Sequence, residues 1–339
     1  MQRIQLGKTG IEIEKNGFGA LPIQRISKEE AARLLRMAFE GGMNYFDTAR
    51  SYSDSEEKLG YAFEGMRDRL IIATKTAALT AEGLRKDLET SLRNLKTDYI
   101  DIYQFHNPAF CPLPGGEDGL YDAALKAKEE GKIRHISITN HRLAVAQEAI
   151  DSGLYATLQF PYSYLSGPQE EELLEACRRA GMGFIAMKAL AGGLIRDGYT
   201  AAAFMEGKAE VVPIWGVQRD WELEQFLDVV KNGAELTPER QATIEKDRAE
   251  LAGDFCRGCG YCMPCPGGIE INNCARMSLM LRRAPAKAWL TEEWQEKMRQ
   301  IENCLHCGAC AAKCPYSLDT PRLLQDNYED FWKVLEENR

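Results

Sequence analysis

The sequence has no long apolar run and no block of basic residues. No stretch approaches the ~20 apolar residues that cross a bilayer, and residues 1–20 lack the basic start and apolar core of a signal peptide. The formal net charge is −9, and no Lys/Arg cluster stands out. We therefore expect no membrane and no nucleic acid among the partners, and a cytoplasmic location by default.

The sequence also lacks a glycine-rich dinucleotide signature. Gly17-Phe18-Gly19-Ala20 is too short to match G-x-G-x-x-G after the first expected strand. This absence argues against a doubly wound sheet, the alternative fold for a chain of alternating strands and helices. What the chain does have is 339 residues with an apolar fraction of 45%, enough for a globular core and, by length, about two domains.

Strand and helix patterns alternate along residues 1–235. A hairpin is expected over residues 2–14, and Ser27 with Glu30 predicts a capped helix start. Strands are predicted at Gly17–Pro22, Asn44–Ala49, Leu70–Thr74, Tyr99–Phe105, Ile133–Thr139, Thr157–Phe160, Phe184–Met187 and Val211–Trp215. Helices such as Ala81–Leu95, Leu120–Glu130, Leu143–Ser152, Glu170–Ala180 and Trp221–Lys231 are predicted between them. Eight such units predict a (β/α)8 TIM barrel.

Polar residues follow three successive predicted strands. Asp47 and Tyr52 come at the end of the second strand and after it, Lys75 ends the third, and His106 ends the fourth. In a TIM barrel these positions meet at the carboxyl end, where chemistry takes place. A lysine beside a tyrosine lowers the pKa of the phenol and makes it a usable proton donor. An aspartate keeps the lysine charged, and a neutral histidine hydrogen-bonds a substrate oxygen. We interpret these four residues as catalytic.

The same segments resemble a known family. They are similar to motifs of the aldo-keto reductases, over about residues 1–250: Phe46-Asp47-Thr48-Ala49 with Tyr52 and Ser55-Glu56, Thr74-Lys75, Gln104-Phe105-His106, Ile136–His141, Gln159–Ser163 and Pro213–Gly216. The resemblance implies that a small-molecule carbonyl is reduced by hydride from NADPH. It makes Tyr52 the proton donor, tuned by Lys75 and Asp47, and His106 the residue that orients the carbonyl.

The resemblance also implies a nicotinamide site. Asn140 and Gln159 match family positions that bind the carboxamide, and Thr139 stands where the family often has serine.

Other positions of this site depart from the family pattern. Met187 and Lys188 stand where the family stacks an aromatic residue on the nicotinamide, and Gln225-Phe226 stands where it grips the adenine. Gln218 and Arg219 lie where a 2′-phosphate is held, which favours NADP(H) as the expected cofactor. An arginine on the surface without that role is an equally good interpretation of Arg219.

Eight of the eleven cysteines fall in two runs near the end of the chain. Cys304–Pro315 reads C-x2-C-x2-C-x3-C-P, the pattern that binds iron–sulfur clusters in bacterial ferredoxins, and Cys256–Pro266 is a compressed copy. In two-cluster ferredoxins the C-P cysteine ligates the other cluster. By that rule one 4Fe-4S cluster takes Cys256, Cys259, Cys262 and Cys314, and the second takes Cys304, Cys307, Cys310 and Cys265.

Zinc is the competing metal, but zinc modules use separated CxxC pairs rather than unbroken runs. In a reducing cytoplasm clustered cysteines indicate metal or redox chemistry and not disulfides. Because exposed clusters are damaged by oxygen, we expect an anaerobic or microaerobic cell. Cys274 is interpreted as a core cysteine and Cys111 as a loop thiol.

The domain plan follows from these patterns. Residues 1–235 form the barrel, 236–253 a connecting helix stopped by Gly253, 254–320 a ferredoxin-type domain with two clusters, and 321–339 a terminal helix. A connecting helix of about 15 residues spans ~22 Å and would return the chain to the carboxyl end of the barrel. The clusters are therefore expected beside the catalytic residues. Barrel and tail together are similar to a subgroup of aldo-keto reductases with a C-terminal dicluster domain.

Three functions stay open at this point. The first is an NADPH-dependent carbonyl reductase whose clusters exchange electrons with the substrate or a redox partner protein. The second is a reductase without nicotinamide, in which the clusters supply single electrons and Tyr52 the proton. The third is a reductase whose clusters are structural. Neither the substrate nor the oligomeric state follows from the sequence.

Overall fold

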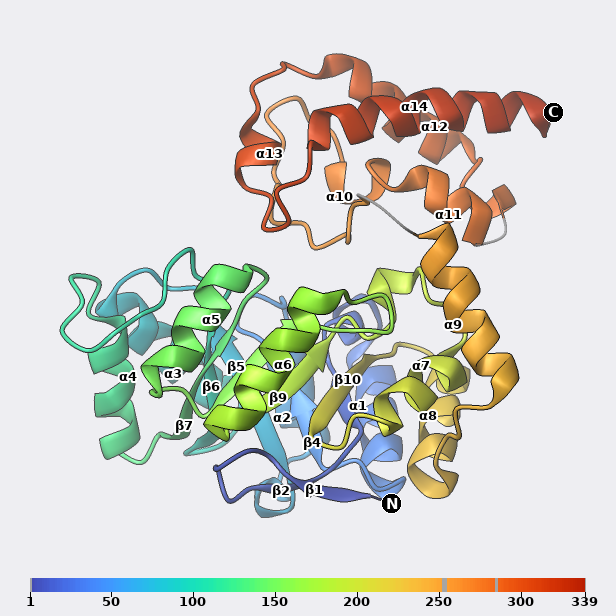
Figure 1. Ribbon diagram of the computed structural model, residues 1–339. Helices are drawn as coiled ribbons and strands as arrows, with labels where there is room; N and C mark the ends of the chain where they lie inside the picture. Colours follow the sequence, from blue (N-terminus) through green and yellow to red (C-terminus); the bar gives the residue numbers. More distant parts are fainter. Residues whose placement is uncertain (1, 252–254, 284–285, 339) are drawn as a thin grey trace. The chain divides into compact units, whose positions relative to one another are not determined.

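The computed structural model describes residues 2–251, 255–283 and 286–338 (Figure 1). Its chain divides into two compact units: residues 1–189 with 197–244, and residues 190–196 with 245–339. The second unit therefore includes a short segment, Leu190–Arg196, that follows a strand of the first. Among the described residues, no helix combines the length and apolar character that a bilayer crossing requires.

The first unit is built on a closed barrel of eight parallel strands, in the order β10-β3-β4-β5-β6-β7-β8-β9. The strands are β3 (Gly17–Gly19), β4 (Tyr45–Asp47), β5 (Ile71–Thr76), β6 (Ile100–His106), β7 (Ile133–Thr139), β8 (Thr157–Pro161), β9 (Gly183–Met187) and β10 (Val211–Gly216). This topology confirms the predicted (β/α)8 barrel and excludes the doubly wound alternative.

Helices cover the outside of the barrel (Figure 1). They are α1 (Lys28–Glu40), α2 (Ser55–Ala62), α3 (Ala81–Leu95), α4 (Leu120–Glu129), α5 (Leu143–Ser152), α6 (Pro168–Ala180), α7 (Gly198–Glu206) and α8 (Asp220–Asn232), with 3-10 turns at Pro22–Arg25, Arg67–Arg69 and Ala191–Gly193. The predicted start of α1 is confirmed. Ser27 Oγ accepts a hydrogen bond from Glu30 N, and the Glu30 carboxylate accepts one from Ser27 N, so two amides at the helix start are satisfied.

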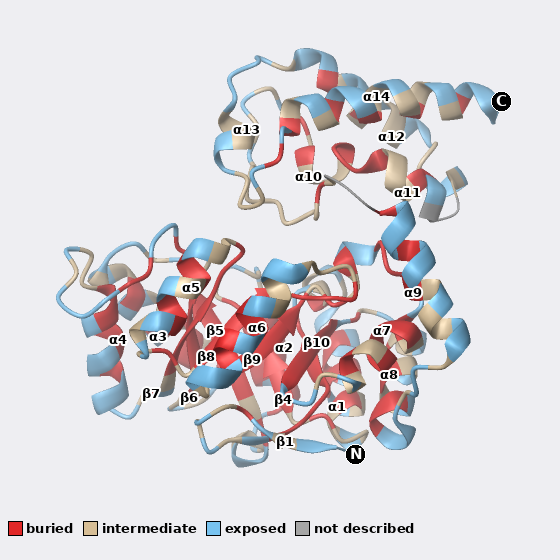
Figure 2. Cartoon of the chain, viewed as in Figure 1, coloured by how far each residue is buried: buried red, intermediate tan, exposed pale blue. Residues whose placement is uncertain are grey.

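The strands form the buried centre of the unit, as Figure 2 shows. A hairpin of β1 (Arg3–Gln5) and β2 (Glu12–Glu14) closes one end of it. Lys8 N donates to Gly181 O just before β9, and Glu14 N donates to Asn44 Oδ1 just before β4. Leu6 and Ile13 are buried in the same apolar cluster as residues of β4, β5, β6, β9 and β10. The hairpin therefore covers the amino end of the strands, and the carboxyl end carries the candidate site.

The second unit is mainly helical. It contains the later part of α9 (Pro238–Glu250), then α10 (Ile271–Cys274), α11 (Met277–Arg283), α12 (Glu292–Arg299), α13 (Ala309–Ala312) and α14 (Thr320–Glu337), with 3-10 turns at Ala286–Ala288 and Gln300–Asn303. Thr291 caps α12, since its Oγ1 accepts a hydrogen bond from Trp294 N. Gly253, the predicted end of the connecting helix, lies outside the described residues.

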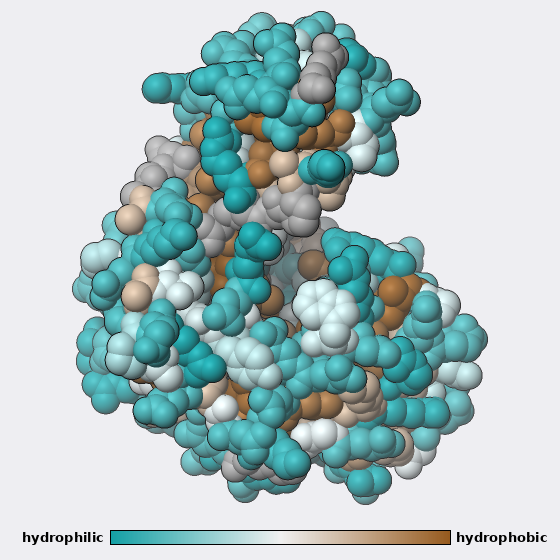
Figure 3. Space-filling view, turned by 90° about the vertical axis from the view of Figure 1, so that its right-hand side faces the viewer, coloured by the Kyte–Doolittle hydropathy of each residue, from teal (hydrophilic) through white to brown (hydrophobic). Residues whose placement is uncertain are grey.

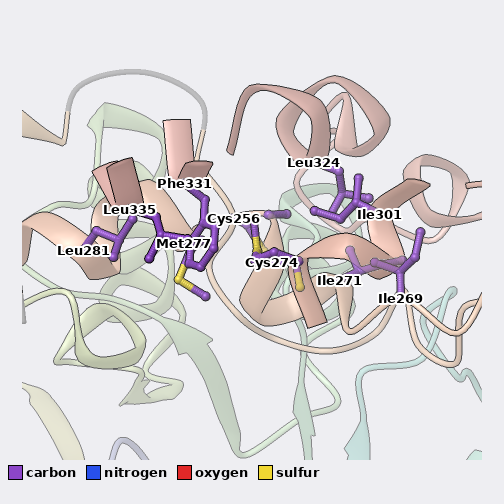
Figure 4. Close-up of a cluster of buried hydrophobic side chains, with 12 residues drawn as sticks. Cys256, Ile269, Ile271, Cys274, Met277, Leu281, Ile301, Leu324, Phe331 and Leu335 are labelled. Atoms are coloured by element: carbon purple, nitrogen blue, oxygen red, sulfur yellow. The ribbon is translucent and has the colours of Figure 1, made fainter. Parts of the chain in front are cut away.

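The core of this unit is a compact set of apolar side chains (Figure 4). It consists of Cys256, Ile269, Ile271, Cys274, Ala275, Met277, Leu281, Met298, Ile301, Leu324, Phe331 and Leu335. Most of the molecular surface in view in Figure 3 is hydrophilic, as the charged fraction of 27% leads one to expect.

Candidate functional site

A buried ion pair lies at the carboxyl ends of β4 and β5. Lys75 Nζ donates to Asp47 Oδ1 at 2.6 Å and to Thr48 O at 2.6 Å, and the two charged side chains are 1% and 3% exposed. Burial lowers the pKa of Lys75 and raises the pKa of Asp47, and the opposite charge of the partner opposes each shift. Lys75 and Asp47 therefore form an ion pair that is shielded from solvent.

Two glutamines hold the Asp47 carboxylate in place. Gln104 Nε2 donates to Asp47 Oδ2 at 3.2 Å and to Gln159 Oε1 at 3.0 Å, and Gln159 Nε2 donates to Asp47 Oδ1 at 3.4 Å. Gln104 is fully buried, and its Oε1 has no hydrogen-bond partner. Sequence reasoning did not single out Gln104 as a site residue. The available signal was its place two residues before His106, which puts both side chains on the same face of β6.

Tyr52 and His106 lie next to each other beside this pair. Tyr52 is half-buried in the turn after β4, and its ring meets the His106 ring edge to face, with centroids 5.8 Å apart at 80°. Lys75 Nζ is 5.2 Å from the centre of the Tyr52 ring. Desolvation, and next the Lys75 ammonium, lower the pKa of His106 to about 3, so its imidazole is neutral at physiological pH. The structure thus brings all four predicted catalytic residues together.

The predicted carboxamide ligands lie on the neighbouring strands. Thr139 ends β7 opposite Gln159 of β8, and Asn140 N donates to Gln159 O at 3.1 Å. Thr139 Oγ1 lies 3.9 Å from the Met187 sulfur at the end of β9. All four side chains are buried. The ends of β7, β8 and β9 therefore place a hydroxyl, two carboxamides and a thioether close to one another, and the Gln159 carboxamide also contacts Asp47.

Asn140 already has partners within the barrel. Its Nδ2 donates to Pro108 O at 2.9 Å, and its Oδ1 accepts from the backbone of His141 and Arg142 at 2.9 and 2.8 Å. These contacts anchor the long loop after His106. A carboxamide bound by the Asn140 side chain would therefore compete with the anchoring of this loop.

The remaining predicted cofactor residues follow β9 and β10. Lys188 has a left-handed backbone conformation with φ +56°. Gln218 is half-buried and Arg219 exposed, and their backbone amides donate to Glu222 Oε2 at 2.9 and 3.2 Å. Phe226, at an adenine position of the family, is buried and stacked on Trp215 with ring centroids 4.3 Å apart. Phe226 therefore belongs to the core.

In the second unit the cysteines of the two runs line two cavities. The first cavity is lined by Cys256, Cys259, Cys262 and Cys314. The second cavity is lined by Cys265, Cys304, Cys307 and Cys310, with Cys262 also reaching it. Each run contributes to both cavities. Cys262 belongs to the walls of both, so the two cavities are neighbours.

The chemistry of these walls suits a polynuclear cluster. In the described part of the chain no three His, Cys, Asp or Glu side chains converge as they would around a single metal ion. The eight cysteines of the two runs instead line two cavities. Burial raises the pKa of the Cys262 thiol to about 12, so ligation would have to displace its proton.

Two other cysteines are packed apart from these cavities. Cys274 is buried in the apolar core, and burial raises its pKa to about 12. The Cys111 sulfur is buried 3.8 Å from the Tyr155 hydroxyl. The structure therefore places Cys274 as a core residue and gives Cys111 a packed position within its loop.

The comparisons with known proteins agree with this architecture. Residues 4–246 match the aldo/keto reductase family, and residues 255–319 match the 4Fe-4S dicluster domain. The chain is an oxidoreductase that belongs to the aldo/keto reductase family and carries a C-terminal 4Fe-4S dicluster domain. This confirms the family and the iron–sulfur domain predicted from the sequence.

Individual relatives are distant. L-galactose dehydrogenase of Arabidopsis thaliana is 32% identical over 211 residues, which cover 57% of this chain and 66% of that protein, just under two thirds. The NADH-specific methylglyoxal reductase of Escherichia coli (strain K12) is 27% identical over 278 residues, covering 72% and 83%. An aldo-keto reductase from Klebsiella pneumoniae, solved in complex with NADPH, shares the fold with a TM-score of 0.60 at 24% identity, covering 73% of this chain and 95% of that one.

Proposed function

We propose that the protein reduces the carbonyl group of a small molecule at the carboxyl end of its barrel, with Tyr52 as the proton donor. The observation that carries this proposal is the position of Lys75, which contacts Asp47 and lies beside the Tyr52 ring. When the Tyr52 phenol gives up its proton, negative charge develops on its oxygen. A buried ammonium next to the ring stabilises that charge, because little water is present to screen it.

The other residues of the site prepare this step. Asp47, fixed by Gln104 and Gln159, keeps the Lys75 side chain in one place and offsets the cost of its burial. His106 stays neutral and donates a hydrogen bond to the substrate carbonyl, which both orients and polarises it.

We propose NADP(H) as the hydride source for this site. Thr139, Asn140 and Gln159 would hold the nicotinamide carboxamide, with Met187 and Lys188 beside the ring and Gln218 and Arg219 at the 2′-phosphate. Buried amide and hydroxyl groups on adjacent strand ends are the donors and acceptors that a carboxamide requires, so the residues at this end fit. Bound NADP(H) would supply two electrons and a proton equivalent as hydride. The K. pneumoniae neighbour was solved with NADPH, while the E. coli relative is named NADH-specific, so both dinucleotides belong in the assay.

The two cysteine cavities support two 4Fe-4S clusters with crossed ligands. Cys256, Cys259, Cys262 and Cys314 would hold the first cluster, and Cys304, Cys307, Cys310 and Cys265 the second. These clusters would transfer single electrons between a redox partner protein and the barrel. Because the thiols must stay reduced and oxygen damages exposed clusters, we place the protein in the cytoplasm of a cell that lives with little oxygen.

A second candidate is a reductase without nicotinamide, fed with single electrons from the clusters. The packing of Phe226 on Trp215 favours it, since this family position cannot grip an adenine. So do the existing hydrogen bonds of Asn140 and Gln159. Tyr52 keeps the same role in both candidates.

The first experiment measures binding and turnover without air. The full-length protein is mixed with NADPH, NADH or reduced methyl viologen, and with methylglyoxal and other small carbonyl compounds as probes. Binding of NADPH or NADH at or below about 1 mM, with carbonyl-dependent oxidation, supports the first candidate. Turnover with the viologen alone supports the second. No turnover with any donor and any carbonyl would contradict the proposed function.

The second experiment tests the proton donor. Tyr52→Phe should lower turnover about 10²- to 10⁴-fold and leave the iron content unchanged. Tyr61→Phe is the matched control, because Tyr61 lies at the surface of α2 with its ring under Lys28. Full activity of Tyr52→Phe would rule out Tyr52 as the donor.

A further inference from the structure

Arg276 is a buried cation that packs against Gly258, two residues from Cys256 of the first cavity. The arginine among the residues that line this cavity is Arg257. Arg276 lies between α10 and α11, is 9% exposed, and donates from Nη1 to Gly192 O at 2.9 Å. Its Nε is buried without a hydrogen-bond partner. The Gly192 contact ties it to Leu190–Arg196, the segment that follows β9 and belongs to the same compact unit.

The guanidinium packs on the loop that carries the first ligands. A Cβ on Gly258 would lie 2.8 Å from Arg276 Nη1 and 2.9 Å from its Cζ, so a side chain there would displace the guanidinium. Gly258 N in turn donates to Cys256 Sγ at 3.4 Å. Gly258 therefore contacts the Arg276 guanidinium and also donates a hydrogen bond to the sulfur of Cys256, a proposed cluster ligand.

No carboxylate balances this charge in the part of the chain that the structure describes. Burial lowers the pKa of Arg276, and negative charge on Cys256 would oppose that shift. Taking an arginine out of water without an opposite charge is costly, so the complete site should contain an anion. A cluster held by four thiolates in the first cavity meets this requirement.

The second cavity has a different environment. Its loop, Leu305–Gly308, is exposed, Leu305 by 65%, and neither Lys nor Arg is among the residues that line it. Water can therefore stabilise added negative charge at the second cluster. The first cavity has no exposed cysteine and includes the buried Cys256, whereas Cys307 of the second is exposed. Burial alone would therefore disfavour reduction of the first cluster, because reduction adds one negative charge.

We propose that Arg276 is the counter-cation of the first cluster and raises its reduction potential, which offsets the effect of burial. This inference rests on the proposed occupancy of the two cavities. Reduction of the first cluster takes up one electron, and Arg276 stabilises the added charge without exchanging a proton. Compensation of this kind keeps the potentials of the two clusters close, and Cys262, shared by both cavities, lies between them.

The test is an anaerobic redox titration of the full-length protein followed by electron paramagnetic resonance, with Cys307→Ser used to assign the signal of the first cluster. Arg276→Gln should lower the equilibrium constant for reduction of the first cluster at least about tenfold, or roughly 59 mV for one electron. Arg276→Lys keeps the charge and should shift it by less than half of that amount. Arg282→Gln is the control, since Arg282 is 56% exposed and paired with Asp330, and should cause no shift.

Hydrogen exchange distinguishes the effect of the Arg276 charge from the effect of its hydrogen bond to Gly192. Both Arg276 variants should increase exchange in Leu190–Arg196, because lysine cannot reproduce the guanidinium contact with Gly192. The shift in potential should be at least twice as large in Arg276→Gln as in Arg276→Lys.

Three outcomes would overturn the proposal. One is an unchanged potential in Arg276→Gln at full iron content. Another is loss of the first cluster from both variants, since Arg276 would then hold the loop and not tune the cluster. The third is a wild-type protein without cluster signals, which would contradict the proposed occupancy itself.

Discussion

In the barrel, eight strands pair into a closed sheet, and their side chains fill an interior that needs no cofactor. In the second unit, the two cysteine loops, residues 256–268 and 304–318, contain only one short helix, α13. Its apolar core comprises twelve buried residues packed between short helices and α14. From this difference we predict that burial alone holds the barrel together and that the second unit needs bound clusters to fix its cysteine loops.

The largest expected effect comes from removing iron. Chelation after oxidation should abolish protection of residues 255–319 against protease and hydrogen exchange, while α1 to α8 keep theirs. The physical reason is that the cysteine loops have few backbone hydrogen bonds of their own. Mass spectrometry of the peptides measures both units in one sample. Equal protection of the cysteine loops with and without iron would contradict the prediction that clusters fix these loops.

The next effect concerns the charge buried in the barrel. Lys75→Met should lower the free energy of unfolding of the barrel by about 3–5 kcal/mol, because it leaves Asp47 buried and unpaired. Lys132→Met, whose lysine is 35% exposed and pairs with Glu89, should cost less than about 1 kcal/mol. Urea unfolding followed by circular dichroism gives both values.

A double variant checks the reason for that loss. Lys75→Met with Asp47→Leu should recover most of the stability, since no charge remains unpaired, but not the activity. A double variant as unstable as Lys75→Met would show that packing, and not charge, causes the loss.

A smaller effect is expected at two matched helix caps. Ser27→Ala in the barrel and Thr291→Ala in the second unit should each cost about 1 kcal/mol in the iron-loaded protein. After iron removal the Ser27→Ala cost should persist, and the Thr291→Ala cost should vanish with the folded second unit. Two-phase unfolding curves of the four samples measure this. Persistence of both costs would mean that α12 stays folded without clusters.

The smallest effect is an expected absence of change at His106. Because its pKa is lowered to about 3, the folded protein leaves it neutral while the unfolded chain protonates it below its usual 6.5. Its contribution to stability is therefore complete above pH 6.5 and is lost as pH falls toward 3. Nitrogen NMR between pH 5 and 8 should show no titration of this imidazole. His106→Asn assigns the signal, and a midpoint near 6.5 would contradict the buried, neutral state.

Much of the barrel was predictable because its patterns are local. The predicted β7 and α3 agree with the structure residue for residue, since apolar periodicity and clear ends specify them. The convergence of the four proposed catalytic residues was predictable because strand ends of a barrel meet at one face. Gln104 was not, because its partners Asp47 and Gln159 lie 57 and 55 residues away, and only the closed barrel brings them together.

Less of the second unit could be predicted from the sequence, because contacts between distant segments also determine its structure. Its cysteine spacing predicted the iron–sulfur domain directly. The inclusion of Leu190–Arg196 had no local signal, because Gly192 meets Arg276 across 84 residues. Contacts of this range depend on the assembled core and not on the pattern of either segment.

The β1–β2 hairpin has a consequence for how the barrel interior meets solvent. Leu6 and Ile13 are almost fully buried and close the amino end of the barrel. The barrel interior can therefore meet solvent only at the carboxyl end. If a substrate binds at the carboxyl end as proposed, it will displace water there and lower the dielectric around Lys75 and Asp47. The field of the ion pair on Tyr52 would then be stronger.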